Sequence, residues 1–204
     1  MIKEFLRDLS VQKAPGPHPS FTVFDLLMVL DLIAKKGPIG RGKLAEELEI
    51  GGGVIRTLIN RLKDSGVIST SKLGCSLTKR GMELWNRFQL IIPQKARLIK
   101  NDLTLAPYSV AVQVKGCGDK VRHGLEQRDA AVAVGAEGAV TLVFKTKKLV
   151  APMVSGDLAK DYPRAFGQIS RLMNLEENDV IVIGCAGDMK RAEYGALAAA
   201  WTLI

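Results

Sequence analysis

The segment from Gly51 to Lys63 combines residue types that are suited to reading DNA. Arg56 and Asn60 are four residues apart in a stretch with helical periodicity, so we expect both side chains on one face of a helix. Arginine and asparagine can hydrogen-bond base edges in the major groove, and a lysine such as Lys63 can bind phosphate. The segment therefore predicts a helix that contacts duplex DNA.

A glycine-rich turn can alternatively cradle the phosphates of a nucleotide, but Gly51–Gly53 lies between two predicted helices instead of following a strand. Residues 37–44 almost fit the GxxxxGK frame, yet Leu44 stands where a Ser or Thr would hold magnesium. The turn at residues 116–118 lacks the third glycine of a dinucleotide fingerprint, because Val121 occupies that position. We therefore expect no nucleotide cofactor.

The elements around these residues are predicted in the order helix, helix, turn, helix, two-stranded wing, helix. Thr22 can cap a helix that ends before Gly37, and Thr78 can cap the last helix, which ends near Pro93. The helix expected at residues 53–65 buries a stripe of Ile55, Leu58, Ile59 and Leu62, and residues 67–78 form a hairpin. The residues expected to contact DNA are Arg41, Lys43, Gly53, Val54, Arg56, Thr57, Asn60, Arg61, Lys63, Ser71 and Lys72.

Positive charge is concentrated in the first half of the chain. Residues 1–105 contain 17 Lys and Arg against 10 Asp and Glu, a net +7, whereas residues 106–204 contain 12 against 11, a net +1. Such an excess attracts a polyanion such as nucleic acid, or an acidic membrane surface. The N-terminus lacks a secretory signal and no apolar run approaches the roughly 20 residues of a membrane helix, so we expect a cytoplasmic protein with no membrane partner.

Residues 44–84 resemble the winged helix-turn-helix of bacterial and archaeal transcription regulators. The resemblance implies a recognition helix at residues 53–65 and a wing at residues 67–78. The glycine triplet departs from the Ser or Thr that commonly begins the recognition helix, so the resemblance does not define the DNA sequence that is read. The matching segments are Leu44-Ala45-Glu46-Glu47-Leu48, Arg56 through Leu62, Ser65-Gly66-Val67-Ile68, and Leu77-Thr78-Lys79-Arg80-Gly81 with Leu84.

Residues 103–204 are expected to form a second domain. Helices packed on a mixed or antiparallel sheet would make it a two-layer α/β domain. The fold class is then α+β, with an N-terminal helix and proline-rich loop at residues 1–20 and the winged helix-turn-helix at residues 21–102. Strands are predicted at residues 108–114, 139–144, 149–154 and 180–183, and helices at residues 121–134, 157–173 and from residue 190.

The second domain is similar to the GAD module, which is inserted in bacterial aspartyl-tRNA synthetases and occurs in subunits of the tRNA-dependent amidotransferase. Asn178 and Ala198 depart from the pattern of that module. Because the module is not catalytic in those enzymes, the resemblance implies a fold and no reaction. A winged helix joined to such a domain also resembles a family of uncharacterised archaeal proteins. The similar segments are residues 135–139, 158–172 and 177–188, with Gly195-Ala196-Leu197 closing the match.

A polar group at the start of the second domain is a candidate site for a small anionic effector. Free N–H groups at a turn and at a helix N-terminus favour an anion. The simpler interpretation is a tight glycine turn followed by an exposed Arg122–Glu126 pair. The candidate effector-binding residues are Gly116, Gly118, Lys120, Arg122, Glu126 and Arg128.

Residue types do not support an enzyme or a metal site. His18 and His123 are the only histidines, and the cysteines at positions 75, 117 and 185 form no CxxC pair. We expect buried free thiols, no disulfide framework, no metal and no catalytic residues.

The sequence therefore predicts a DNA-binding transcription regulator whose second domain serves effector binding, dimerisation or both. A homodimer is expected, because sequence-specific regulators commonly place two recognition helices one duplex turn apart, and the apolar stretch 88–92 is the candidate seam. The GAD-like module suggests an RNA- or tRNA-associated accessory protein as the alternative. A small-molecule enzyme that uses Glu126, Asp129 or Asp188 is a third hypothesis.

Overall fold

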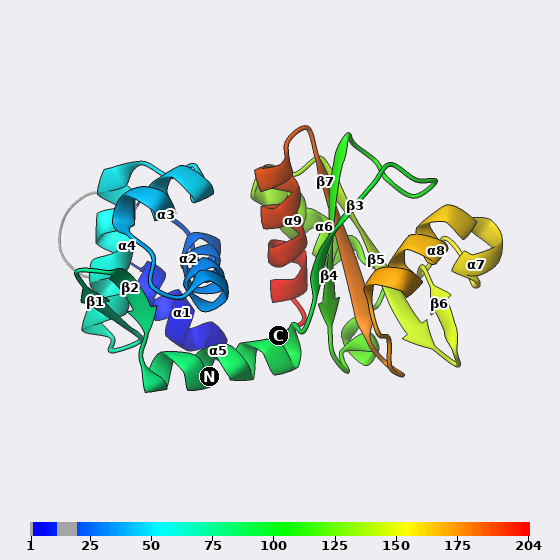
Figure 1. Ribbon diagram of the computed structural model, residues 1–204. Helices are drawn as coiled ribbons and strands as arrows, with labels where there is room; N and C mark the ends of the chain where they lie inside the picture. The colour runs from blue at the N-terminus through cyan, green and yellow to red at the C-terminus, as the bar shows by residue number, and fades with distance from the viewer. Residues whose placement is uncertain (1, 12–19) are drawn as a thin grey trace. The chain divides into compact units, whose positions relative to one another are not determined.

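The computed structural model describes residues 2–11 and 20–204, and the chain divides into two compact units, Met1–Phe88 and Gln89–Ile204. The architecture is mixed α+β, as predicted, with a helical N-terminal unit followed by a unit of sheet and helices (Figure 1). The second unit begins at Gln89 and not at residue 103, because the strand Lys95–Leu98 belongs to its sheet. The expected proline-rich loop falls on residues 12–19, which lie outside the described residues.

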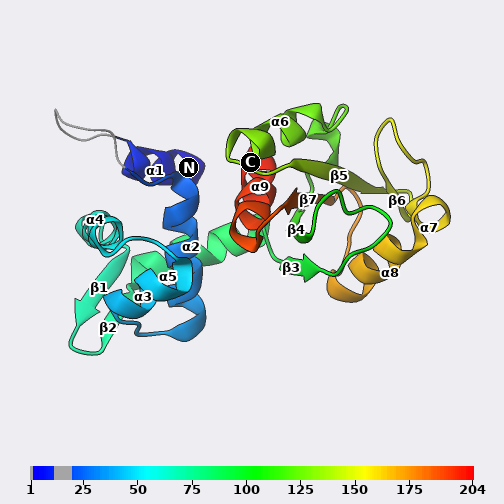
Figure 2. The same cartoon turned by 90° about the horizontal axis from the view of Figure 1, so that it is seen from above.

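The N-terminal unit has its helices in the predicted order, and both predicted threonine caps are confirmed. Thr22 and Asp25 form a reciprocal capping box at the start of α2, and the Thr78 hydroxyl accepts a hydrogen bond from the Gly81 N–H at 3.0 Å. Figure 2 shows these elements from a second direction. The elements are α1 (Ile2–Ser10), α2 (Val23–Lys36), α3 (Arg41–Leu48), α4 (Gly52–Asp64), β1 (Ile68–Ser71), β2 (Gly74–Leu77) and α5 (Lys79–Ile91).

The hairpin β1–β2 is held against the helices by direct backbone contact. Ile39, just before α3, exchanges two backbone hydrogen bonds with Cys75 of β2, at 3.1 and 2.8 Å. A Cβ added to Gly74 would lie 2.5 Å from the Ile39 carbonyl carbon, and one added to Gly81 would overlap the Val67 carbonyl oxygen. Only glycine permits such close approach, so these two positions fix where the hairpin lies in this unit.

The C-terminal unit contains a five-stranded sheet in the order β3-β4-β7-β5-β6, and every neighbouring pair is antiparallel. The sequence analysis left a mixed and an antiparallel sheet open, and the sheet is antiparallel. The strands are β3 (Lys95–Leu98), β4 (Tyr108–Val114), β5 (Gly138–Lys145), β6 (Lys148–Val150) and β7 (Val180–Ala186). The helices are η1 (Gly118–Lys120), α6 (Leu125–Ala133), α7 (Leu158–Asp161), α8 (Pro163–Leu172) and α9 (Met189–Trp201).

Helices cover both faces of this sheet, so the unit has three layers where the sequence analysis expected two. The α6–α9 layer packs on one face, and α7 and α8 lie on the other (Figure 1). The alternation of β7 explains why: Ile183 packs in a buried cluster with Ile169 of α8, while Gly184 faces Ala196 of α9. The two-layer prediction was wrong because it assigned all helices to one side.

Several predicted elements have different ends for identifiable reasons. The helix expected at residues 121–134 starts at Leu125, because Gly124 has a φ of 76° and interrupts it. The helix expected at residues 157–173 is divided at Pro163, which can begin a helix but not continue one. The strand expected at residues 149–154 ends at Val150, where a turn follows in which Met153 has a φ of 64°.

We predict that Gly184→Ala destabilises the C-terminal unit by about 1–3 kcal/mol, since overpacking a tight contact costs that much. The new methyl group would overlap the backbone of α9 at Ala192 and Ala196. Gly156→Ala is the matched control, because nothing lies within 4 Å of its added Cβ and its φ is ordinary. Urea unfolding followed by Trp201 fluorescence in a Trp85→Phe background measures both, and equal midpoints would contradict the prediction.

Candidate nucleic-acid interface

The outer face of α4 presents Arg56, Asn60 and Lys63 as one exposed stripe. The predicted inner stripe, from Ile55 to Leu62, is fully buried, so the helix has the expected orientation in its unit. Positions i, i+4 and i+7 lie above one another on a helix, and all three side chains are exposed. The structure thus brings together the two predicted base-reading residues and Lys63, the predicted phosphate-binding residue.

The hairpin, which follows α4 and packs against it, adds two more exposed predicted residues. Ser71 ends β1 and Lys72 begins the turn, and both side chains are exposed. We refer to Arg56, Asn60, Lys63, Ser71 and Lys72 as the α4–hairpin surface.

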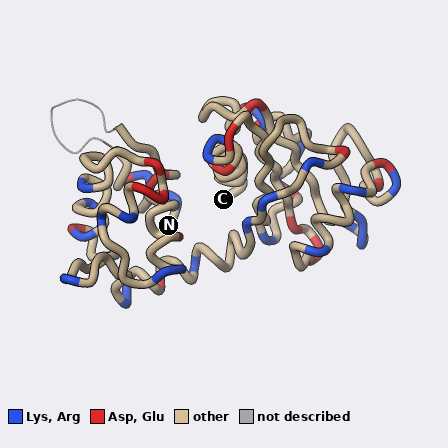
Figure 3. Tube along the Cα trace, turned by 45° about the horizontal axis from the view of Figure 1, so that its top comes forward, with Lys and Arg blue, Asp and Glu red and all other residues tan. Residues whose placement is uncertain are grey.

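Cations in the N-terminal unit divide into paired and unpaired sets. The paired lysines lie on α2 and α3: Lys35 with Asp31 at 2.7 Å, Lys36 with Glu47 at 2.5 Å and Lys43 with Glu46 at 3.1 Å. Within the described residues, no carboxylate pairs with Arg41, Arg56, Lys63 or Lys72. Figure 3 marks the Lys and Arg positions along the trace. The cations without a carboxylate partner in the described part of the chain therefore include Arg41 and all three cations of the α4–hairpin surface.

Lys43 and Arg61, two of the residues expected to contact DNA, both have partners within the protein. The hydrogen bond from Lys43 to Glu46 raises the pKa of Lys43 and offsets the charge that DNA would meet. Arg61 donates to the carbonyls of Leu9 and Val11, both at 2.6 Å, and its guanidinium lies 4.9 Å from the centre of the Phe21 ring. Arg61 thus anchors the end of α1 and is removed from the candidate DNA contacts.

The three remaining predicted residues of α4 lie around its start. Val54 is half-buried, and the Thr57 hydroxyl donates to the Gly53 carbonyl at 3.2 Å. An added Cβ at Gly51, Gly52 or Gly53 would meet nothing within 4 Å, and none of the three has a positive φ. Neither packing nor backbone conformation within the protein requires glycine there.

Acidic residues are distributed unevenly among the first turns of the helices. Glu4 and Asp25 occupy the first turns of α1 and α2, whereas the first turns of α3, α4 and α5 contain none. A carboxylate in a first turn stabilises a helix by about 0.3–1 kcal/mol through the helix dipole. The helices α3, α4 and α5 each lack this stabilisation. Lys79 instead begins α5, exposed and with no carboxylate paired to it among the described residues. The sequence analysis did not include Lys79 among the residues expected to contact DNA. A lysine in the first turn of a helix opposes the helix dipole, and this feature is visible in the sequence.

The observed unit boundary moves part of the positive charge. Residues 1–88 contain 14 Lys and Arg against 9 Asp and Glu, a net +5, and residues 89–204 contain 15 against 12, a net +3. The asymmetry between the two observed units is therefore smaller than that on either side of residue 105, because residues 89–105 belong to the second unit. The N-terminal unit keeps a clear excess of positive charge.

The predicted seam at residues 88–92 is partly buried and partly exposed. Phe88 and Ile92 are buried, and only Leu90 is strongly exposed among the three, at 76%. One exposed leucine alone is a normal surface feature, and the role of this stretch as a dimerisation seam stays a prediction.

The predicted effector residues do not form one anion cradle. The Gly116 N–H donates to Asp179, the Gly118 N–H donates to the Asn178 carbonyl, and Lys120 donates to the Leu203 carbonyl at 2.6 Å. Arg128 pairs with Asp129 at 2.8 Å. Arg122 lies before α6 and is exposed, as is Glu126, so their expected i,i+4 pairing within one helix was wrong. The protein itself already uses the candidate donors of Gly116, Gly118, Lys120 and Arg128.

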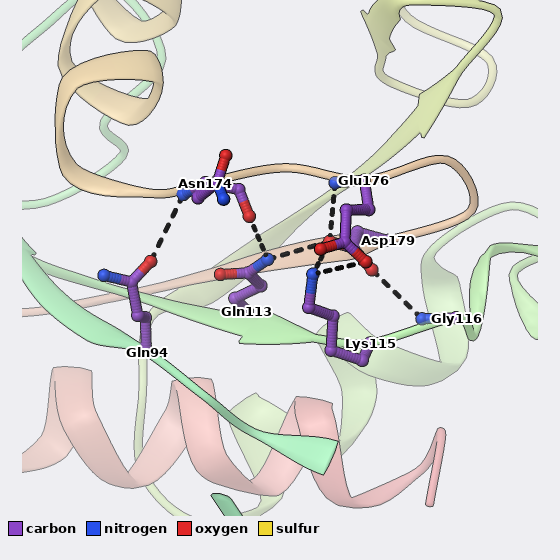
Figure 4. Close-up of polar contacts among 7 residues, drawn as sticks. All are labelled: Gln94, Gln113, Lys115, Gly116, Asn174, Glu176 and Asp179. Atoms are coloured by element: carbon purple, nitrogen blue, oxygen red, sulfur yellow. Dashed lines mark hydrogen bonds and ion pairs between the residues drawn. The ribbon is translucent and has the colours of Figure 1, made fainter. Parts of the chain in front are cut away.

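Asp179 is the functional-looking carboxylate that the sequence analysis missed, and its role is structural (Figure 4). It is 1% exposed and accepts hydrogen bonds from Gln113 at 2.8 Å, from the Glu176 N–H at 2.9 Å and from Lys115 and the Gly116 N–H at 3.1 Å. Burial acts to raise the pKa of Asp179, but these donors outweigh it and hold the pKa below its usual value. The charged carboxylate thus joins β4, the turn after it and the loop before β7.

Comparisons with known proteins agree with a two-domain arrangement. Residues 22–83 match the family model of the PH0730-like N-terminal domain, and residues 105–203 match a domain of unknown function, DUF4443. The hypothetical protein PH0730 from Pyrococcus horikoshii OT3 is 27% identical, with a TM-score of 0.74 over 90% of this chain and 93% of that chain. No curated protein matches the chain. The resemblance to the GAD module stays a prediction.

Three further properties of the described residues bear on function. No helix among them is both long and apolar enough to cross a membrane. Cys75, Cys117 and Cys185 are buried free thiols, as predicted. In residues 2–11 and 20–204, no three His, Cys, Asp or Glu side chains lie where they could share a metal ion.

We predict that Asp179→Asn destabilises the C-terminal unit by about 3 kcal/mol, because it leaves the buried donors around Asp179 without their charged partner. The folded-state pKa of Asp179 is lowered, so its stabilisation is complete above the unfolded pKa of about 3.9 and is lost as the pH falls through the folded pKa. Wild-type stability should therefore fall more steeply in acid than that of the variant.

Glu176→Gln is the control, because this exposed partner of Lys115 should contribute less than about 1 kcal/mol. Urea unfolding at a series of acidic pH values measures all three proteins. Parallel pH profiles for wild type and Asp179→Asn would contradict the assigned role.

Proposed function

We propose that the protein is a DNA-binding transcription regulator and that its N-terminal unit is a winged helix-turn-helix. In this proposal α3 and α4 form the helix-turn-helix, α4 enters the major groove, and the β1–β2 hairpin is the wing. The observation that carries it is the exposed, unpaired stripe of Arg56, Asn60 and Lys63 beside the bare glycine start of the same helix. Arg56 and Asn60 would hydrogen-bond base edges, and Lys63 and Lys72 would bind phosphates.

The glycine triplet at positions 51–53 supports this proposal, because packing within the protein does not require it. A glycine in a helix costs roughly 0.5–1 kcal/mol relative to alanine, yet no neighbour and no positive φ requires one at Gly52 or Gly53, the first two residues of α4. Backbone without side chains allows a phosphate to approach the unpaired N–H groups at a helix start. DNA as the external partner explains a choice that the fold alone does not.

The distribution of charge at the helix starts supports the same partner. Carboxylates in the first turns of α3, α4 and α5 would stabilise those helices but repel a phosphate backbone. These first turns have none, and Arg41 and Lys79 stand in two of them with no paired carboxylate among the described residues. Both are proposed to bind backbone phosphates next to the contacts of α4.

The proposal extends to a homodimer, which would present two copies of α4 to half-sites about 34 Å apart. Because Phe88 and Ile92 of the stretch 88–92 are buried, the C-terminal unit is proposed to supply the dimer contact.

We predict that Arg56→Ala and Asn60→Ala each lose about 1–3 kcal/mol on duplex fragments selected from sheared genomic DNA but little on random duplex. Lys72→Ala should weaken both, because it removes a phosphate contact. Lys35→Ala is the matched control, since Asp31 already pairs with Lys35. Fluorescence anisotropy over a salt series measures the affinities, with a log-log slope near −0.9 per phosphate neutralised.

Equal losses on selected and random DNA would remove Arg56 from base reading. Competition with transfer RNA tests the alternative hypothesis of an RNA-associated protein. Preferential retention of transfer RNA over duplex DNA would replace the proposed function with that one.

We predict that Gly53→Ala raises thermal stability while lowering DNA affinity. Alanine should stabilise α4 by about 0.5–1 kcal/mol, whereas its methyl group would hinder approach of a phosphate and weaken binding roughly fivefold. Gly167→Ala in α8 makes the same replacement in a helix of the other unit, and should stabilise without changing affinity. A Gly53→Ala protein that is stabilised and binds DNA as tightly as wild type would remove the glycine from the interface.

A further inference from the structure

The tip of the β1–β2 hairpin is a short, well-supported projection. The Ser71 hydroxyl accepts a hydrogen bond from the Leu73 N–H at 3.1 Å, which closes the turn from within. Directly after the turn, Gly74 packs on the Ile39 backbone and Cys75 is hydrogen-bonded to the same residue. These contacts hold the tip in a defined position relative to the helices of its unit.

What the tip presents is one large apolar side chain among polar ones. Leu73 is 79% exposed, whereas Ile68 and Cys75 of the same hairpin are buried. Turn positions favour Gly, Asn, Asp and Ser, and the leucine here leaves most of its surface exposed. The residues that lead to it, Ser69 through Lys72, are polar and exposed. Leu73 is thus an isolated apolar tip with a cation directly beside it.

DNA-binding proteins use this combination at the minor groove. An apolar side chain such as leucine can insert between base steps, unstack them in part and bend the duplex, while neighbouring cations hold the flanking phosphates. The minor groove is about 6 Å wide, so it admits a narrow projection and excludes a helix. A two-residue turn that carries Lys72 and Leu73 matches both requirements.

We propose that Leu73 is a minor-groove wedge: it enters the groove next to the site of α4 and bends the DNA, with Lys72 on an adjacent phosphate. The proposal rests on the DNA-binding function proposed above and adds a specificity mechanism to it. Since pyrimidine–purine steps are the most easily unstacked, DNA with a flexible TA step in the hairpin-contacted segment is favoured without any hydrogen bond to its bases.

The test measures bending directly. A selected duplex with a fluorescent donor and acceptor at its two ends is saturated with protein, and energy transfer reports the end-to-end distance. Wild type should shorten this distance, as a bend of about 20–90° requires. Leu73→Ser should lose most of the shortening and bind roughly fivefold more weakly, whereas Leu73→Phe, which keeps a wedge, should bend as wild type does.

Lys72→Ala is the matched control on the same turn, and should weaken binding but bend the duplex fully once saturated. Circular dichroism checks that each variant is folded, which the exposure of Leu73 favours. Binding by wild type without bending, or full bending by Leu73→Ser, overturns the wedge and leaves the DNA-binding function standing. If Leu73→Ser bends the duplex fully but no longer self-associates in sedimentation, the wedge proposal is overturned. Leu73 would then contact a second copy of the protein instead of DNA. Absence of any duplex binding by wild type overturns the wedge together with the proposed function.

Discussion

Close contact between backbones is the constraint on which both units depend. In the N-terminal unit the hairpin reaches its position because Gly74 and Gly81 let it touch the chain at Ile39 and Val67. In the C-terminal unit Gly184 does the same for α9 on β7. At each of these positions a single methyl group would separate two elements, so glycine there determines tertiary structure and not local flexibility. The glycines at positions 51–53 differ from these three, because a Cβ added there would meet no neighbour within 4 Å. Tertiary packing therefore does not explain them.

A second constraint is electrostatic, and here stability and the proposed function oppose each other. First-turn carboxylates stabilise α1 and α2, but the first turns of α3, α4 and α5 lack them. Lysines on α2 and α3 have carboxylate partners, whereas those of the α4–hairpin surface have none among the described residues. Within the N-terminal unit these stabilising pairs and carboxylates therefore lie on elements other than α4 and the hairpin, although α8 and α9 of the C-terminal unit lack first-turn carboxylates as well.

Local patterns predicted much of this structure, and long-range contacts account for most of what was missed. Helical periodicity identified the buried stripe of α4, and capping preferences located Thr22 and Thr78, because both depend on residues within one or two turns. The edge strand Lys95–Leu98 was missed because four residues with two cations carry little strand signal, and only pairing with β4 defines it. The break at Pro163 was visible in the sequence and was overlooked. The second helical layer depends on which face each helix covers, and periodicity alone does not contain that information.

Site residues show the same division between local and long-range information, most clearly in the two arginines of α4. Arg56 and Arg61 are identical in type and lie five positions apart, so residue type alone made both candidates for DNA contact. Their places on the helix differ: Arg56 is exposed, whereas Arg61 lies against α1 and satisfies the Leu9 and Val11 carbonyls. Carbonyls at the end of a helix have no partner within it, so a nearby guanidinium is drawn to them. Asp179 was missed for the same reason, because its donors come from residues as far away in sequence as Gln113. A charged residue can therefore be assigned to a binding site only after the hydrogen-bonding groups of the fold that it could satisfy have been identified.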